Sequence, residues 1–209
     1  MKLKVCGMKY PENIQAVANL NPNYLGFIFH EKSPRYAANT LDANQLSALS
    51  GNIQKVGVFV NEEFQTIEQN CNDFHIKTVQ LHGDESSNFC EKLKDSGFTV
   101  VKAFGINKNF DFNILNQYVA YCDFFLFDTK TDEHGGSGKK FKWDLLNQYH
   151  LELPYFLSGG ISPDDLNEIK NIKNENLYAI DVNSRFEIEA GLKDVTMLNL
   201  LINRIKDEF

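Results

Sequence analysis

The sequence lacks several features that would assign it to a class at once. No apolar run approaches the roughly 18 residues that a membrane helix needs, and the segment before Gly7 has no hydrophobic signal region. Basic residues are also few: 21 Lys and Arg against 28 Asp and Glu give a net charge of −7. This balance argues against a nucleic-acid groove or an anionic membrane surface as partner. We therefore expect a cytoplasmic protein that binds neither nucleic acid nor membrane.

Cysteine is scarce and scattered. The four cysteines, at positions 6, 71, 90 and 122, form no C-x-x-C pair and have no histidine nearby in the sequence. Such spacing is poor for a disulfide framework and for a metal site. We expect free thiols in a reducing compartment and no metal site.

What the sequence does contain is an alternation of short β-branched and aromatic runs with longer segments of helical period. The runs that predict strands are Leu3–Cys6, Tyr24–Phe29, Lys55–Val60, Thr78–Leu81, Thr99–Phe104, Asp123–Phe127, Pro154–Leu157 and Leu177–Ile180. The amphipathic stretches between and after them are Pro11–Leu20, Asp42–Leu49, Glu63–Phe74, Ser86–Asp95, Phe110–Tyr121, Trp143–Tyr149, Pro163–Ile172 and Val195–Ile205.

Eight such units predict an α/β fold, a (β/α)₈ TIM barrel of near-minimal length, as a single domain over residues 1–209. The strands read as continuous apolar runs, as expected in a parallel sheet that is buried on both faces. A doubly wound open sheet is the alternative. It usually carries a glycine-rich fingerprint after its first strand, where this chain has Cys6-Gly7-Met8-Lys9.

Active sites of such barrels lie at the C-terminal ends of the strands, so the residues there are the candidates for chemistry. Cys6 ends the first strand. A buried free cysteine is most often only a small apolar group, but the helix that opens at Pro11 places amides nearby that favour a thiolate. Asp128 follows the apolar run 124–127, where desolvation should raise the pKa of a carboxyl and suit it to proton donation. The competing interpretation of Asp128 is a solvated loop residue or a helix cap.

Two turns after the seventh and eighth strands are candidates for an anion site. Gly159 and Gly160 precede Ser162 and Pro163, an N-cap and first-turn pair, and backbone amides at such a turn can bind an anion. Glycine can also occur in such a turn only because the backbone there adopts a positive φ. The second turn is 181–184, and loops after strands 7 and 8 commonly form the phosphate site of these barrels.

Three further features of the sequence bear on the site. Arg35 has the planar fork that suits a carboxylate, although a surface salt bridge is the more common explanation for such an arginine. His82 is a ligand, a base or a structural histidine. The segment 135–139 lacks the spacing of a phosphate-binding loop and instead predicts a loop that closes over the site after strand 6.

Taken together, these motifs resemble those of the phosphoribosylanthranilate isomerase family. The resemblance covers essentially the whole chain in order, and no single motif decides it. The segments that carry it are 5–8, 25–29, 33–36, 56–61, 79–83, 127–129, 135–138 with Phe141 and Trp143, 157–161, 181–184 with Glu187, and 191–194.

The resemblance implies a cofactor-free Amadori rearrangement of N-(5-phosphoribosyl)anthranilate to 1-(2-carboxyphenylamino)-1-deoxyribulose 5-phosphate, the third step of tryptophan synthesis from chorismate. By resemblance, Asp128 is the general acid on the ring oxygen, Cys6 is the general base that takes the C2 proton, and Arg35 binds the anthranilate carboxylate. The residues expected on the phosphate and sugar side are Gln80, His82, Gly159, Gly160, Asp181, Asn183 and Ser184. Association with other tryptophan-pathway enzymes is a further partnership that the resemblance suggests.

Two positions depart from the family pattern. Ile161 stands where leucine is common, a harmless change. Arg185 stands where family members usually have glycine. If the position needs a positive φ, arginine strains the backbone. If it does not, Arg185 either points into solvent, which we favour, or adds a cation near the phosphate.

Three other functions are alternatives to this one. The related aminoimidazole-carboxamide ribotide isomerase of histidine synthesis uses an aspartate where Cys6 stands. A metal-dependent epimerase would need more ligands than His82 and Asp128 supply. An inactive barrel that binds a phosphorylated metabolite or a partner protein is the non-enzymatic alternative.

Overall fold

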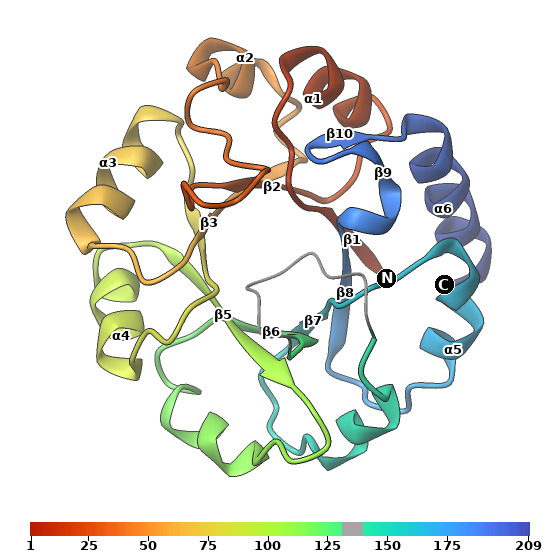
Figure 1. Ribbon diagram of the computed structural model, residues 1–209. Helices are drawn as coiled ribbons and strands as arrows, with labels where there is room; N and C mark the ends of the chain where they lie inside the picture. The colour runs from red at the N-terminus through yellow and green to blue at the C-terminus, as the bar shows by residue number, and fades with distance from the viewer. Residues whose placement is uncertain (131–139) are drawn as a thin grey trace.

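Eight parallel strands close into a barrel in a computed structural model that describes residues 1–130 and 140–209 (Figure 1). The strands are β1 Lys2–Val5, β2 Tyr24–Ile28, β3 Gln54–Phe59, β4 Thr78–Leu81, β5 Thr99–Ile106, β6 Phe124–Thr129, β7 Tyr155–Leu157 and β8 Leu177–Val182. Each pairs with its neighbour in sequence, and β1 pairs with β8 to close the ring, with Val5 opposite Val182. The predicted (β/α)₈ barrel is confirmed, and the open-sheet alternative is wrong.

Helices surround the barrel as an outer ring (Figure 1). They are α1 Pro11–Ala18, α2 Ala43–Ala48, α3 Phe64–Asp73, α4 Ser87–Asp95, α5 Leu166–Lys170 and α6 Val195–Glu208. Their starts follow from local chemistry. The side chains of Asp42, Ser86 and Asp194 accept hydrogen bonds from backbone N–H groups in the first turns of α2, α4 and α6, which satisfies donors that have no partner within the helix.

Two of the expected helices are 3₁₀ segments instead. The connection after β5 forms η1 Phe112–Gln117, and the connection after β6 forms η2 Trp143–Gln148. In η1 the side chains of Asp111, Asn113 and Asn116 hydrogen-bond the local backbone or one another. These bonds compete with α-helical pairing. The stretch Pro163–Ile172 likewise divides into η3 Pro163–Asp165 and the short α5.

A small hairpin between β8 and α6 was not predicted. After the 3₁₀ turn η4 Ser184–Phe186, strand β9 Glu187–Glu189 pairs antiparallel with β10 Leu192–Lys193. Gly191 turns the hairpin with a φ of +88°, and a Cβ there would lie 2.9 Å from Cβ of Lys9. Strands of three and two residues are too short to give a readable alternation.

The core has two layers because side chains on a strand alternate between its two faces. One layer fills the barrel interior and includes Val58, Ala103, Leu126 and Ala179. The other lies between the strands and the surrounding helices and includes Leu25, Phe127 and Ile180. On each strand, the residue two positions after an interior-layer residue points to the same side. At the C-terminal end of the strand it therefore faces the mouth of the barrel.

The glycine-rich segment 135–139, expected to form a loop over the site, lies outside the described residues. Within the parts of the chain that the structure describes, no helix is long and apolar enough to span a membrane.

Candidate active site

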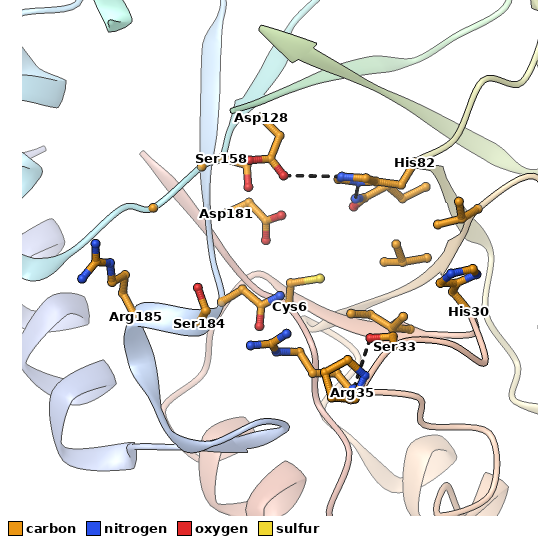
Figure 2. Close-up of a pocket in the computed structure, with 18 of the residues that line it drawn as sticks. Cys6, His30, Ser33, Arg35, His82, Asp128, Ser158, Asp181, Ser184 and Arg185 are labelled. Carbon is orange, nitrogen blue, oxygen red and sulfur yellow. Dashed lines mark hydrogen bonds and ion pairs between the residues drawn. The ribbon is translucent and has the colours of Figure 1, made fainter. Parts of the chain in front are cut away.

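A cavity of about 580 Å³ opens at the C-terminal ends of the barrel strands. Its size is within the range of small-molecule sites. All ten residues expected in the site line it: Cys6, Arg35, Gln80, His82, Asp128, Gly159, Gly160, Asp181, Asn183 and Ser184. Figure 2 shows Cys6, Asp128 and Asp181 around the centre of this cavity, with His82 facing Asp128 across it.

Asp128 lies near the end of β6 and is oriented by two contacts. Its Oδ1 accepts a hydrogen bond from the backbone N–H of Thr129 at 2.7 Å, and its Oδ2 lies 3.4 Å from Nε2 of His82 (Figure 2). The amide Nε2 of Gln80 lies 2.8 Å from Nδ1 of His82. This contact from Gln80 holds the imidazole plane so that Nε2 faces Asp128.

Gly159 allows β7 and β6 to approach closely at this carboxylate. Its φ is +95°, and a Cβ built there would lie 2.9 Å from Oδ1 of Asp128 and 2.8 Å from the nitrogen of Thr129, and would overlap Oγ1 of Thr129. Only a residue without a Cβ fits both the space and the backbone conformation. Gly159 therefore helps to fix the position of Asp128 as well as lining the anion turn.

Cys6 follows β1 directly, and its backbone N–H donates to the carbonyl of Val182 at 2.9 Å. The thiol occupies space left by Gly26, whose added Cβ would lie 2.9 Å from Sγ. Burial raises the pKa of the Cys6 thiol, while Lys4 and Lys193 act to lower it. The expectation that helix-terminal amides would make this cysteine a ready thiolate is therefore wrong: desolvation is the larger effect.

Asp181 is not part of the turn in which the sequence placed it. Strand β8 continues to Val182, so Asp181 points into the barrel interior and forms an ion pair with Lys4 at 2.9 Å. Burial raises the pKa of Asp181 and outweighs the opposing effect of Lys4. Asp181 Oδ1 and Gln80 Oε1 are both buried without a hydrogen-bond partner among the described residues. Buried polar atoms of this kind call for a ligand or an ordered water.

The glycine turn after β7 has the geometry of an anion site. Gly159 and Gly160 both have positive φ, +95° and +67°, and among the described residues their backbone N–H groups donate no hydrogen bond. Successive free amides in such a conformation form a concave anion-binding surface. The predicted N-cap is also confirmed: Ser162 precedes η3, and Oδ2 of Asp165 accepts hydrogen bonds from its N–H and hydroxyl.

Arg185 is exposed, and its φ is not positive. The account in which arginine strains this turn is therefore wrong. The guanidinium lies at the edge of the cavity, on the same side as Ser184 (Figure 2).

Arg35 lines the cavity and is held by a partner that the sequence did not indicate. Its Nε and Nη2 donate to the carboxylate of Glu187 at 2.9 and 2.7 Å. The two side chains are only 12% and 5% exposed, so this is not the surface salt bridge considered above. Lys193, fully buried, binds the same carboxylate at 2.6 Å and Oδ1 of Asn183 at 2.6 Å.

Lys4, Glu187 and Lys193 are therefore site residues that sequence reasoning missed. A lysine inside the apolar run of β1 was a usable signal for Lys4, because lysine is almost never fully buried unless it is paired. Glu187 and Lys193 stand in segments that carry the family resemblance, but the sequence assigned neither a role in the site, because their hairpin is too short to recognise. In the described part of the chain, no group of three or more His, Cys, Asp or Glu could hold a metal ion.

Comparison with known proteins agrees with this geometry. The family model described as N-(5'-phosphoribosyl)anthranilate (PRA) isomerase matches residues 3–204. An N-(5'-phosphoribosyl)anthranilate isomerase of Parabacteroides distasonis is 41% identical, over 98% of this chain and 93% of its own. The crystal structure of phosphoribosyl anthranilate isomerase from Thermotoga maritima superposes with a TM-score of 0.86 at 31% identity, covering 99% of both chains.

A second solved structure is a phosphoribosyl anthranilate isomerase in complex with reduced 1-(o-carboxyphenylamino)-1-deoxyribulose 5-phosphate. It has a TM-score of 0.82 at 27% identity and also covers 99% of both chains. These matches favour this family over the isomerase of histidine synthesis and over an inactive barrel. The chain belongs to the N-(5'-phosphoribosyl)anthranilate isomerase family and converts N-(5'-phosphoribosyl)anthranilate to 1-(o-carboxyphenylamino)-1-deoxyribulose 5-phosphate in tryptophan biosynthesis.

Proposed function

We propose that the isomerisation proceeds by general acid and general base catalysis, with Asp128 as the acid and Cys6 as the base. The observation that carries the proposal is that both groups line one cavity together with a turn of free amides. Asp128 protonates the ring oxygen of the sugar and opens it to an iminium. Cys6 then removes the C2 proton, and the resulting enolamine tautomerises to the ketone.

The surroundings of Asp128 support its role. Its carboxyl is held by the Thr129 amide on one oxygen and faces His82 with the other. It emerges from the apolar strand β6, in which 125–127 are fully buried. A general acid must lie within hydrogen-bond reach of the atom it protonates, and these contacts aim the carboxyl across the cavity.

Cys6 is suited to act as the base after the sugar ring has opened. Burial raises the pKa of its thiol, so a thiolate formed there binds a proton more strongly than an ordinary one. Lys4 and Lys193 supply the positive charge that opposes this shift. The iminium formed in the first step makes the C2–H acidic and places a further positive charge beside the sulfur.

The two ends of the substrate are held at opposite sides of this pair. The phosphate binds the Gly159–Gly160 amides with the Asn183–Ser184 turn, near the short η3. The anthranilate carboxylate binds Arg35. The unpartnered oxygens of Gln80 and Asp181 accept hydrogen bonds from the sugar hydroxyls. The complex of the related enzyme with a reduced product analogue supports a ligand of this size and charge.

We also propose a cytoplasmic location and association with other tryptophan-pathway enzymes. Four widely spaced cysteines without a C-x-x-C pair are typical of a protein in a reducing compartment, which supports the first. The pathway to which the family belongs supports the second.

The direct test is steady-state turnover of freshly prepared N-(5'-phosphoribosyl)anthranilate, followed by fluorescence. Cys6→Ala and Asp128→Asn should each lower kcat by a factor of roughly 10² to 10⁴, the usual contribution of a general acid or base, with KM little changed. Cys71→Ala, which removes a buried thiol from α3, is the matched control and should keep kcat. Near-normal kcat in Cys6→Ala or Asp128→Asn would remove that residue from the mechanism.

A further inference from the structure

Glu187 is a charged group beside the cavity that has no role in the mechanism proposed above. It starts β9, its side chain is 5% exposed, and it accepts hydrogen bonds from three different residues. Its Oε1 is shared by Nε of Arg35, Nζ of Lys193 and the N–H of Gly191, at 2.9, 2.6 and 3.0 Å. Its Oε2 accepts from Nη2 of Arg35 at 2.7 Å. A carboxylate exposed to water does not need this many hydrogen-bond donors from the protein.

The pairing with Arg35 leaves one edge of the guanidinium available. A guanidinium has five N–H groups in a fixed plane, and Glu187 takes the edge formed by Nε and Nη2. No hydrogen bond among the described residues uses Nη1. The edge formed by Nη1 and the second Nη2 hydrogen therefore remains for a second carboxylate, and Arg35 lines the cavity.

The charges of the cluster lead to the same conclusion. Arg35 and Lys193 contribute two positive charges and Glu187 one negative charge, so the buried cluster carries one net positive charge in its protonated form. Buried charges are costly unless they are paired. A ligand carboxylate on the free edge of Arg35 brings the cluster to neutrality.

We propose that Glu187 is a positioning residue that presents the free edge of Arg35 to the carboxylate on the substrate's aromatic ring, and so sets the preference for a ring that carries a carboxylate. This proposal rests on the proposed binding role of Arg35. The hairpin β9–β10 is the device that holds it, because Glu187 starts one strand and Lys193 ends the other. Asn13 of α1 fixes the backbone of Lys193 through both its N–H and its carbonyl, at 2.8 and 2.9 Å.

The test compares Glu187→Gln with Glu189→Gln, an exposed carboxylate on the same strand. A glutamine at position 187 has only one oxygen that can accept hydrogen bonds. Its N–H₂ group would face the N–H donors of Arg35, and the ion pair would be lost. For the natural substrate, Glu187→Gln should raise KM about tenfold or more while kcat falls less than about threefold, because Arg35 binds ground state and transition state alike. Glu187→Asp should restore part of the affinity. Glu189→Gln should match the unmodified chain.

A second readout separates positioning from a purely structural role. Affinity is measured for two competitive inhibitors, the reduced product analogue with the ring carboxylate and the same compound without it. Glu187→Gln should reduce the preference for the carboxylate-bearing compound about tenfold, and the double variant with Arg35→Ala should lose little more than Arg35→Ala alone. Equal weakening toward both inhibitors, or lower thermal stability with an unchanged preference, would overturn the proposal.

Failure of this proposal is distinguishable from failure of the proposed function. If Arg35→Ala keeps the full preference for the carboxylate, the binding role assigned to Arg35 is wrong. If Arg35→Ala loses the preference and Glu187→Gln keeps it, Arg35 binds the carboxylate without help from Glu187.

Discussion

Replacing Gly159 with alanine should damage catalysis as well as stability. The new methyl group would meet the Asp128 carboxylate at 2.9 Å and the Thr129 nitrogen at 2.8 Å, closer than Cβ atoms approach neighbours in folded proteins. Either the end of β6 or the glycine turn must shift. A misplacement of about 1 Å in a catalytic group can cost about 10²-fold in rate, and we expect kcat to fall between about tenfold and a hundredfold.

The strain of a positive φ must be separated from this steric effect. Gly97, in the turn between α4 and β5, has a φ of +87°, close to the +95° of Gly159, but an added Cβ there has no atom within 4 Å. Gly97→Ala therefore reports the backbone strain alone, about 1–2 kcal/mol. In a chain of this size that corresponds to a lower melting temperature by about 2–8 °C.

The assay pairs thermal unfolding with steady-state turnover for both variants. Gly97→Ala should lose stability and keep kcat. Gly159→Ala should lose at least as much stability and, in the protein that remains folded, also lose kcat. If Gly159→Ala kept kcat within about twofold of the unmodified chain, Gly159 would not fix the position of Asp128, and the reasoning from close approach would be refuted.

Two further predictions concern charged groups at the cavity. Arg185→Gly should change KM less than about threefold, which is under 0.7 kcal/mol, because backbone amides can hold a phosphate without an added cation; a salt-dependent rise of tenfold or more would instead make Arg185 a phosphate ligand. Alkylation of Cys6 by iodoacetamide, followed by mass spectrometry, should require a higher pH than an ordinary thiol because burial raises its pKa. Lys4→Met should move that profile to still higher pH, since Lys4 opposes the shift; a move to lower pH would contradict the electrostatic account of the thiol.

The strands could be predicted from the sequence because each is a short apolar run between polar segments. All eight were found, with ends that differ by at most two residues. The helical connections were harder. The stretches after β5 and β6 have helical period, yet they form 3₁₀ segments. After β5, local side-chain hydrogen bonds of Asp111 and Asn116 compete with α-helical pairing.

The site residues were predictable because a parallel barrel brings all strand ends to one rim. Cys6 and Asp128, 122 positions apart in the sequence, line the same cavity for that reason alone. The ion pairs between charged residues around the cavity were not predictable. The Lys4–Asp181 and Arg35–Glu187 pairs join residues 177 and 152 positions apart, and which charges meet depends on the strand register and on a hairpin too short to recognise.

The measurement that tests the central claim most directly is the kinetic isotope effect with substrate deuterated at C2 of the sugar. If Asp128 opens the ring and Cys6 then removes the C2 proton, each variant makes its own step rate-limiting. Cys6→Ala should show a full primary isotope effect on kcat, and Asp128→Asn should show an effect close to one. The same effect in both variants, or a large effect confined to Asp128→Asn, would contradict the assignment of acid and base.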